Sequence, residues 1–186
     1  MARRNEIRII AGRWRGRRLH FPAASGLRPT PGVVRETLFN WLQADVAGSR
    51  CLDLYAGSGA LGFEAASRGA ADVVQVEADA RVARALMENV RLLQAEQVKV
   101  VRSDVGRYLR RQVDTPFDLV FLDPPFGRGE VADCCRALES GGWLTPGARI
   151  YVEAESKLMP EVPDNWRPLR HKRVGEVGYH LYQRSA

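Results

Sequence analysis

Two prolines and an aromatic residue directly follow an acid in the run Asp123-Pro124-Pro125-Phe126. The prolines fix φ and remove two backbone donors, so they leave carbonyl oxygens pointing outward. A carboxylate and a carbonyl can together accept both hydrogens of an exocyclic base amine and turn its lone pair toward a methyl donor. Phe126 offers the base a stacking surface that contributes ~1–3 kcal/mol. The run predicts methylation of a base amine, and a plain turn with an incidental aromatic residue is its structural alternative.

A second chemical pattern is the glycine-rich run Gly57-x-Gly59-x-x-Gly62, with Glu77 lying 20 residues after Gly57. Nicotinamide enzymes and methyltransferases share this fingerprint. Asp53, at the end of the preceding apolar run, favours the second class. Its carboxylate would repel a pyrophosphate at a helix N-terminus, whereas S-adenosylmethionine carries an ammonium and a sulfonium. The alternative for Asp53 is a cap on the following helix.

Two further acids complete the predicted cofactor site. Glu77, after the second predicted strand, can accept hydrogen bonds from both ribose hydroxyls of S-adenosylmethionine. Asp104, after the third, is placed to accept from the adenine amino group. An ordinary helix N-cap is the alternative for Asp104.

Alternating strands and helices are expected to position these residues. The pattern predicts strands at 51–54, 73–76, 98–101, 117–122 and 148–153. It predicts helices from the glycine run to a stop at Gly69 and at 81–93, 105–111 and 129–139. Thr30-Pro31 indicates a further helix, with Thr30 as its N-cap and an end near Asp45. Strands 168–173 and 179–184 form an antiparallel C-terminal edge. The predicted fold is α/β, a mostly parallel sheet with ligands at the carboxyl ends of its strands.

The positive charge is concentrated at the N-terminus. Residues 1–35 hold nine arginines and one acid, a local sum of +8, and the whole chain carries +6, which leaves −2 for the other 151 residues. Ranges 7–11 and 17–21 resemble two short strands, so a basic β-hairpin arm is predicted. A polyanion is the expected partner, and a solvated, solubilising surface is the alternative. The expected RNA contacts are Arg13, Trp14, Arg15, Arg17, Arg18, Arg28 and Arg35.

Several classes of protein are disfavoured by composition. Cys51, Cys134 and Cys135 form no CxxC or Cys/His cluster, which predicts reduced thiols, no bound metal and a cytoplasmic location. No apolar run approaches the ~20 residues of a membrane span. No signal peptide follows the early arginines, and their strand-like alternation favours a folded arm over a transit peptide. We expect a monomer without a membrane partner.

The motifs together resemble a known family. Residues 53–59, Glu77, Asp104 and 123–126 fall in the order of the class I amino-methyltransferases. Residues 9–16, 28–30 and 34–42 extend the likeness to the bacterial 16S rRNA guanine-N2 methyltransferases, over essentially the whole chain. This resemblance implies a Rossmann-like sheet of seven strands, S-adenosylmethionine as methyl donor and a flipped guanine as acceptor. The partner is then 16S rRNA in the assembling or assembled small subunit.

On this reading residues 1–27 form the basic arm and residues 28–186 the methyltransferase domain. The predicted catalytic residues are Asp123, Pro124, Pro125 and Phe126. The predicted cofactor-binding residues are Thr30, Asp53, Tyr55, Ala56, Gly57, Ser58, Gly59, Glu77, Asp104, Val105 and Asp123.

Two other functions stay open at this point. Adenine-N6 enzymes share the Asp-Pro-Pro-Phe motif, so a DNA adenine-N6 methyltransferase is the first alternative, although no segment is free to read a DNA sequence. A non-catalytic nucleic-acid-binding protein on a methyltransferase fold is the second. Loss of catalysis should appear first in the glycine run or in 123–126, and both are intact.

Overall fold

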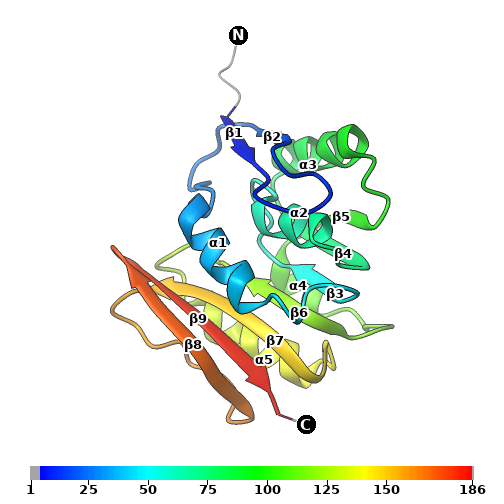
Figure 1. Ribbon diagram of the computed structural model, residues 1–186. Coiled ribbons are helices and arrows are strands. Elements are labelled where there is room, and N and C mark those ends of the chain that lie inside the picture. The colour runs from blue at the N-terminus through cyan, green and yellow to red at the C-terminus, as the bar shows by residue number, and fades with distance from the viewer. Residues whose placement is uncertain (1–4, 186) are drawn as a thin grey trace.

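The computed structural model describes residues 5–185 of the 186-residue chain, in which strands alternate with helices (Figure 1). The strands are β1 (Asn5–Arg8), β2 (Arg18–Phe21), β3 (Arg50–Asp53), β4 (Asp72–Glu77), β5 (Val98–Arg102), β6 (Phe117–Leu122), β7 (Leu144–Glu155), β8 (Trp166–Val174) and β9 (Val177–Arg184). The helices are α1 (Gly32–Trp41), α2 (Ala60–Ser67), α3 (Ala80–Leu93), α4 (Val105–Leu109) and α5 (Glu130–Ser140).

The main sheet has seven strands in the order β5-β4-β3-β6-β7-β9-β8. Strands β3 to β7 are parallel, whereas β9 is antiparallel to both of its neighbours. The predicted mostly parallel sheet with an antiparallel C-terminal edge is confirmed. Successive strands extend the sheet to one side of β3 and then, from β6 on, to the other side. Ligands of such sheets bind at this switch point, outside the carboxyl ends of the strands.

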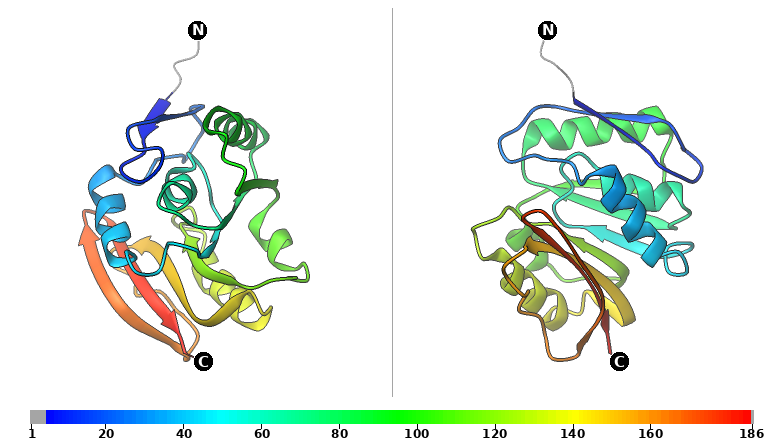
Figure 2. Two further views of the ribbon diagram at one scale, coloured as in Figure 1. Left: turned by 45° about the vertical axis from the view of Figure 1, so that its right-hand side comes forward. Right: turned by 60° about the vertical axis from the view of Figure 1, so that its left-hand side comes forward.

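Helices cover both faces of the sheet (Figure 2). On one face α1, α2 and α3 bury an apolar cluster that includes Leu38, Phe63 and Leu86. On the other face α4 and α5 contribute Tyr108 and Leu138 to a second cluster. Because both faces are covered, the central strands are continuous apolar runs rather than alternating ones. The loops at the strand ends therefore remain as the place for a site.

The N-terminal hairpin lies against α2 and α3 (Figures 1 and 2). Strands β1 and β2 pair from Asn5 opposite Phe21 to Arg8 opposite Arg18. The hairpin is therefore present, but its strands differ from the predicted ranges 7–11 and 17–21. The backbone N–H groups of Ile10 and Ala11 leave the hairpin ladder and donate to the Glu64 carboxylate of α2, at 2.9 and 3.0 Å.

A glycine allows this close docking of the arm. Gly12 has a φ of +84°, and a Cβ atom there would lie 1.9 Å from the Ser67 carbonyl oxygen at the end of α2. The apolar side chains of Ile9, Trp14 and Leu19 join the same cluster as α1–α3. The arm thus shares its core with the rest of the protein, and the division at residue 27 stays an interpretation of the charge pattern.

The predicted helix start at Thr30 is wrong. Helix α1 begins at Gly32 with Pro31 as its N-cap, and no side chain caps it. The Thr30 hydroxyl instead donates to Oε1 of the buried Glu153 at 3.2 Å. A buried carboxylate needs donors, and this need determines where the Thr30 side chain points. The helix also ends at Trp41, four residues before the predicted end at Asp45.

Candidate active site

Acidic residues gather at the carboxyl ends of the parallel strands. Asp53 ends β3 and Glu77 ends β4, while Asp123 directly follows β6. Glu153 lies close to the end of β7. The structure thus brings together three predicted acids and one that the sequence analysis did not select.

The glycine run forms the turn between β3 and α2. Glu77 Oε2 accepts a hydrogen bond from the Gly57 N–H at 2.9 Å, and its Oε1 accepts from the Asp79 N–H at 2.9 Å. Gly59 is the N-cap of α2 with a φ of +79°, and a Cβ there would lie 2.6 Å from the Phe63 ring. Each Glu77 oxygen keeps a lone pair free, so this half-buried carboxylate fits a pair of ribose hydroxyls.

Asp53 is the most enclosed acid of the glycine turn. It is 2% exposed, and its Oδ2 accepts from the Gly62 N–H in the first turn of α2 at 3.1 Å. Asp53 therefore does accept from the following helix, as the alternative of a helix cap predicts, but only through this one contact. Burial raises the pKa of Asp53 to about 7, and the Gly62 N–H only partly opposes that effect. A buried acid of this kind gains most from a cationic ligand, which fits the ammonium of S-adenosylmethionine.

The Asp123-Pro124-Pro125-Phe126 run forms the adjacent loop. Asp123 is half-buried and Pro124 is buried, whereas Pro125 is exposed and the Phe126 side chain is 46% exposed. Burial is the main reason why the pKa of Asp123 lies well above its usual value, with Glu153 as the next cause. The exposed Phe126 ring is free to stack on a base.

Two hydrogen bonds fix the chain that follows Phe126. The Gly127 N–H donates to Glu155 Oε1 at 3.0 Å, which ties the loop to the end of β7. The Tyr55 hydroxyl donates to Glu130 Oε2 at 2.6 Å, which ties the first turn of α5 to the segment after β3. The predicted cofactor residue Tyr55 thus uses its hydroxyl to position this loop.

The remaining predicted cofactor residues lie along the same edge. Ala56 and Ser58 are buried in the turn after β3. Asp104 is exposed and caps α4, where its Oδ1 accepts from the Arg107 N–H at 3.0 Å. Val105 beside it is buried. The capping alternative for Asp104 is therefore realised in the structure, and its contact with adenine stays a prediction.

Comparisons with known proteins decide the family. The family model described as conserved hypothetical protein 95 matches residues 7–183. The ribosomal RNA small subunit methyltransferase D of Escherichia coli strain K12 is 49% identical over 182 residues, which are 97% of this chain and 91% of that protein. Its namesake from Haemophilus influenzae is 45% identical, with 97% and 95% covered.

The chain belongs to the family that this model describes, together with these small subunit rRNA methyltransferases. The solved structure of a putative methyltransferase from Escherichia coli has 48% identity and a TM-score of 0.90, and the match covers 98% of this chain and 99% of that one. An RNA methyltransferase from Salinibacter ruber, in complex with S-adenosyl-L-homocysteine, matches with a TM-score of 0.64 at 18% identity over 85% and 94% of the two chains. This second likeness concerns the fold alone, and the methyltransferase fold predicted from the sequence is confirmed.

The family resemblance does not test the predicted RNA contacts, but the structure corrects two of them. Trp14 is 4% exposed and packs in the core, so it offers no stacking surface. Arg35 is 5% exposed, and its guanidinium donates to the carbonyl oxygens of Thr30 and Arg8 and faces Glu64. The prediction that Trp14 and Arg35 contact RNA is therefore wrong, because burial keeps both from the surface.

The other predicted contacts are exposed, namely Arg13, Arg15, Arg17, Arg18 and Arg28. Arg18 pairs with Glu6 at 3.1 Å, and Arg17 donates to the Leu92 carbonyl oxygen at 3.2 Å. Arg3 and Arg4, which contribute to the arm's charge, lie outside the described residues. The arm is thus a basic surface, part of whose charge is already paired.

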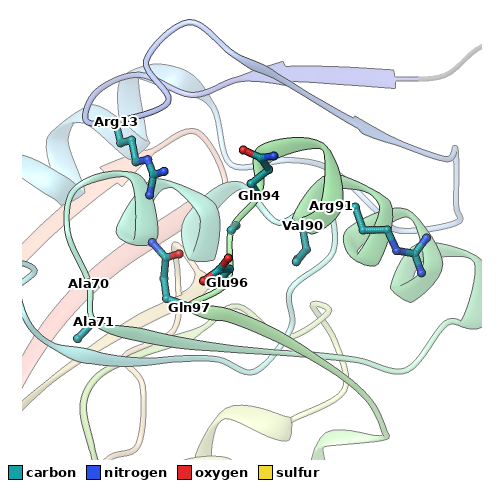
Figure 3. A pocket seen from close by; sticks show the side chains of 9 residues that line it. Arg13, Ala70, Ala71, Val90, Arg91, Gln94, Glu96 and Gln97 are labelled. Carbon is teal, nitrogen blue, oxygen red and sulfur yellow. The ribbon is translucent and has the colours of Figure 1, made fainter.

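A cavity of about 760 Å³ lies beneath the arm (Figure 3). Arg13 of the arm and Gln97, just before β5, point toward one another across it, and Arg91 and Gln94 stand at its α3 side. Ala70 and Ala71, before β4, complete its floor. The cavity therefore lies at the amino ends of the strands, opposite the edge that carries Asp123, and is not the candidate active site.

A second basic surface was missed by the sequence analysis. The edge strand β8 contains no acid and exposes Arg167, Arg170, Lys172 and Arg173. Acids outnumber bases over residues 36–186 as a whole, so the net charge of that region conceals this basic run. Strand β8 runs parallel to β7, so its carboxyl end lies on the same side of the sheet as the candidate site. Charge on an edge strand also protects it from pairing with another chain.

Among residues 5–185, no helix is long and apolar enough to cross a membrane. The same part of the chain holds no group of three or more His, Cys, Asp or Glu side chains arranged to bind a metal ion.

Proposed function

We propose that the protein transfers a methyl group from S-adenosylmethionine to the N2 amine of a guanine in small-subunit rRNA. Relatives of 45–49% identity over nearly the full chain are named for the small-subunit rRNA methyltransferase activity. Their names do not state the atom that is methylated. The N2 assignment is supported by the family resemblance of residues 9–16, 28–30 and 34–42. An rRNA substrate implies a cytoplasmic enzyme, and a monomer remains part of the proposal.

The observation that carries the proposal is the adjacency of Asp53 and Asp123. Strands β3 and β6 are neighbours, and Asp53 is paired with Phe121, two residues before Asp123. The acid proposed to face the cofactor and the acid proposed to face the base therefore meet at one point of the sheet. Methyl transfer needs donor and acceptor atoms ~3–3.5 Å apart and aligned.

The proposed mechanism relies on positioning. When bound, S-adenosylmethionine supplies an electrophilic methyl carbon. Asp123 and the Pro124 carbonyl accept the two N–H groups of the amine and direct its lone pair at that carbon, while Phe126 stacks on the extruded base. Extrusion costs a few kcal/mol and least for an unpaired base. The methylated amine then carries a positive charge and loses one proton, for which the Asp123 carboxylate is the nearest acceptor.

Nucleoside mass spectrometry tests this function. The protein is incubated with labelled S-adenosylmethionine and, in separate reactions, naked 16S rRNA, assembled small subunits and DNA. N2-methylguanosine in either RNA sample is the expected product, and the better substrate identifies the assembly stage. N6-methyladenine in DNA would instead support the first alternative. Absence of methyl transfer to every substrate would support the non-catalytic one.

A further inference from the structure

Glu153 is a buried acid for which the proposed mechanism has not yet given a role. Leu122 of β6 is paired with Val152 of β7, so the next residues, Asp123 and Glu153, lie side by side at the ends of neighbouring parallel strands. Glu153 is 6% exposed. Its side chain faces the α1 side of the sheet, the side on which Tyr151 and Tyr179 also pack.

Two hydroxyl groups donate to the same oxygen of Glu153. The Thr30 hydroxyl lies 3.2 Å from Oε1 and the Tyr151 hydroxyl lies 2.9 Å from it. The Glu153 and Asp123 carboxyl groups lie side by side at the ends of β7 and β6, close enough for each to shift the pKa of the other. Two carboxyl groups can share a hydrogen bond only if one of them holds a proton. The two hydroxyls stabilise the charge on Glu153, so in the free protein the proton lies on Asp123.

The surroundings of this carboxyl pair are acidic or neutral. Asp53 at the end of β3 adds a further negative charge, and Tyr151 and Tyr179 face the pair with neutral phenols. Thr30 is uncharged. Burial and Glu153 both hold the pKa of Asp123 above its usual value, burial being the larger cause. A protonated Asp123 is a poorer acceptor for the target amine than the carboxylate that the proposed mechanism needs.

We propose that Glu153 is a positioning residue that shares one proton with Asp123, orients its carboxyl group and sets the pH above which Asp123 can accept the substrate amine. This inference rests on the proposed function, because Asp123 must be the residue that receives the amine. Glu153 itself does not touch the base. Thr30 and Tyr151 hold the Glu153 charge in place, which gives the predicted site residue Thr30 a role through Glu153.

The decisive experiment compares the pH profile of kcat/KM for RNA in the wild type and in Glu153→Gln, at saturating S-adenosylmethionine. The wild-type profile has an acid limb where Asp123 loses its proton. Glutamine removes the charge that resists this loss and can donate an N–H to the Asp123 carboxylate. The acid limb should therefore move to lower pH. As the pH falls below the wild-type limb, the ratio of the variant rate to the wild-type rate should increase by about tenfold per pH unit, until the variant's own limb is reached.

A purely structural role for Glu153 predicts a different result. Damage to the packing would lower the rate by the same factor at every pH, and parallel profiles would overturn the proposal. Glu176→Gln is the matched control, since it makes the same change in charge at an exposed turn between β8 and β9. Its profile should superimpose on that of the wild type.

A second variant decides the matter if Glu153→Gln does not fold. Tyr151→Phe removes one hydroxyl from Oε1, which makes the Glu153 charge less favourable and moves the shared proton toward Glu153. The acid limb should shift in the same direction by a smaller amount, and an unmoved limb would overturn the proposal. The proposed function fails separately, when the wild type itself makes no N2-methylguanosine.

Discussion

Arg35 of α1 and Glu64 of α2 form a buried ion pair, with 3.6 Å between Nη1 and the nearest carboxylate oxygen and side chains 6% and 0% exposed. Glu64 also bonds Arg68 at 2.8 Å and accepts from the Ile10 and Ala11 N–H groups. This one carboxylate therefore joins α1, α2 and the arm.

Glu64→Ala should destabilise the protein by about 3–5 kcal/mol, because it leaves the Arg35 charge buried without its partner. Urea unfolding measures this loss. Hydrogen exchange of the Ile10 and Ala11 amides should accelerate, since their acceptor is gone. Glu88→Ala on the exposed face of α3 is the control, and an equal loss of stability there would show that Glu64 has no special role.

Asp123→Ala should lower the single-turnover rate by on the order of 10²–10³-fold, the usual effect of losing a polar group that acts in the transition state. The affinity for S-adenosylmethionine should stay within a few fold, because Asp123 is proposed to face the base rather than the cofactor. Single-turnover assays and calorimetry measure the two quantities. Asp114→Ala in an exposed loop is the control. A near wild-type rate in Asp123→Ala would contradict the catalytic assignment.

Glu77→Ala should show the converse pattern. It removes the acceptor proposed for the ribose hydroxyls, a loss of roughly 1.5–3 kcal/mol in cofactor binding. Because Glu77 also holds the Gly57 and Asp79 N–H groups, the variant should melt at a lower temperature as well. Saturating cofactor should largely restore the rate. Unchanged calorimetric affinity would mean that another group holds the ribose.

Cofactor affinity should depend on pH through Asp53, whose pKa is about 7 in the free protein. A cationic ligand favours the ionised carboxylate, so affinity should fall below pH 7 by up to about tenfold per unit and level off above it. The contribution of Asp53 to the folding stability of the free protein should instead decrease as the pH rises. Folding raises this pKa, so the contribution of neutral Asp53 is fully present at low pH and is lost as pH rises through about 7. Calorimetry on Asp53→Asn, which should show a flat profile, checks the assignment.

Replacing Arg13, Arg15, Arg17 and Arg18 with alanine should flatten the salt dependence of RNA binding. Each lost phosphate contact removes ~0.7 units of slope for single strands and ~0.9 for a duplex, up to about 3–4 units for four contacts. The pairing of Arg17 and Arg18 within the protein makes the expected change smaller than this limit. S-adenosylmethionine affinity should not change.

The matched control for the arm removes four positive charges from β8, at Arg167, Arg170, Lys172 and Arg173. If net charge alone governs binding, the two quadruple variants will flatten the slope equally. A larger effect in the arm variant supports its role in RNA binding. An arm variant that loses stability but keeps its slope would end that assignment.

Site residues that follow a strand could be identified from the sequence, whereas buried polar residues within a helix could not. Asp53, Glu77 and Asp123 each end an apolar run, and parallel strands place such ends together. Glu153 carried the same signal after residues 150–152, but its tyrosine and threonine donors come from positions that only folding brings near. The i,i+4 pair of Glu64 with Arg68 is visible in the sequence, but its other partners lie about 30 to 54 residues away in the arm and α1, so its role in joining them could not be predicted. For the same reason, Arg35 and Trp14 looked like surface residues.

The arm loop lies at the amino ends of the parallel strands, whereas the candidate site lies at their carboxyl ends. Arg13 lies near the segments that precede β4 and β5, whereas Asp123 follows the carboxyl end of β6. Strand β4 alone has six residues, or about 20 Å at ~3.3 Å per residue. An RNA that touches Arg13 while its target base rests on Phe126 must span the depth of the domain. With the proposed contacts at Arg13 and Phe126, a free nucleotide could not reach both points and a folded RNA segment could, so the two contacts together would select substrates by size.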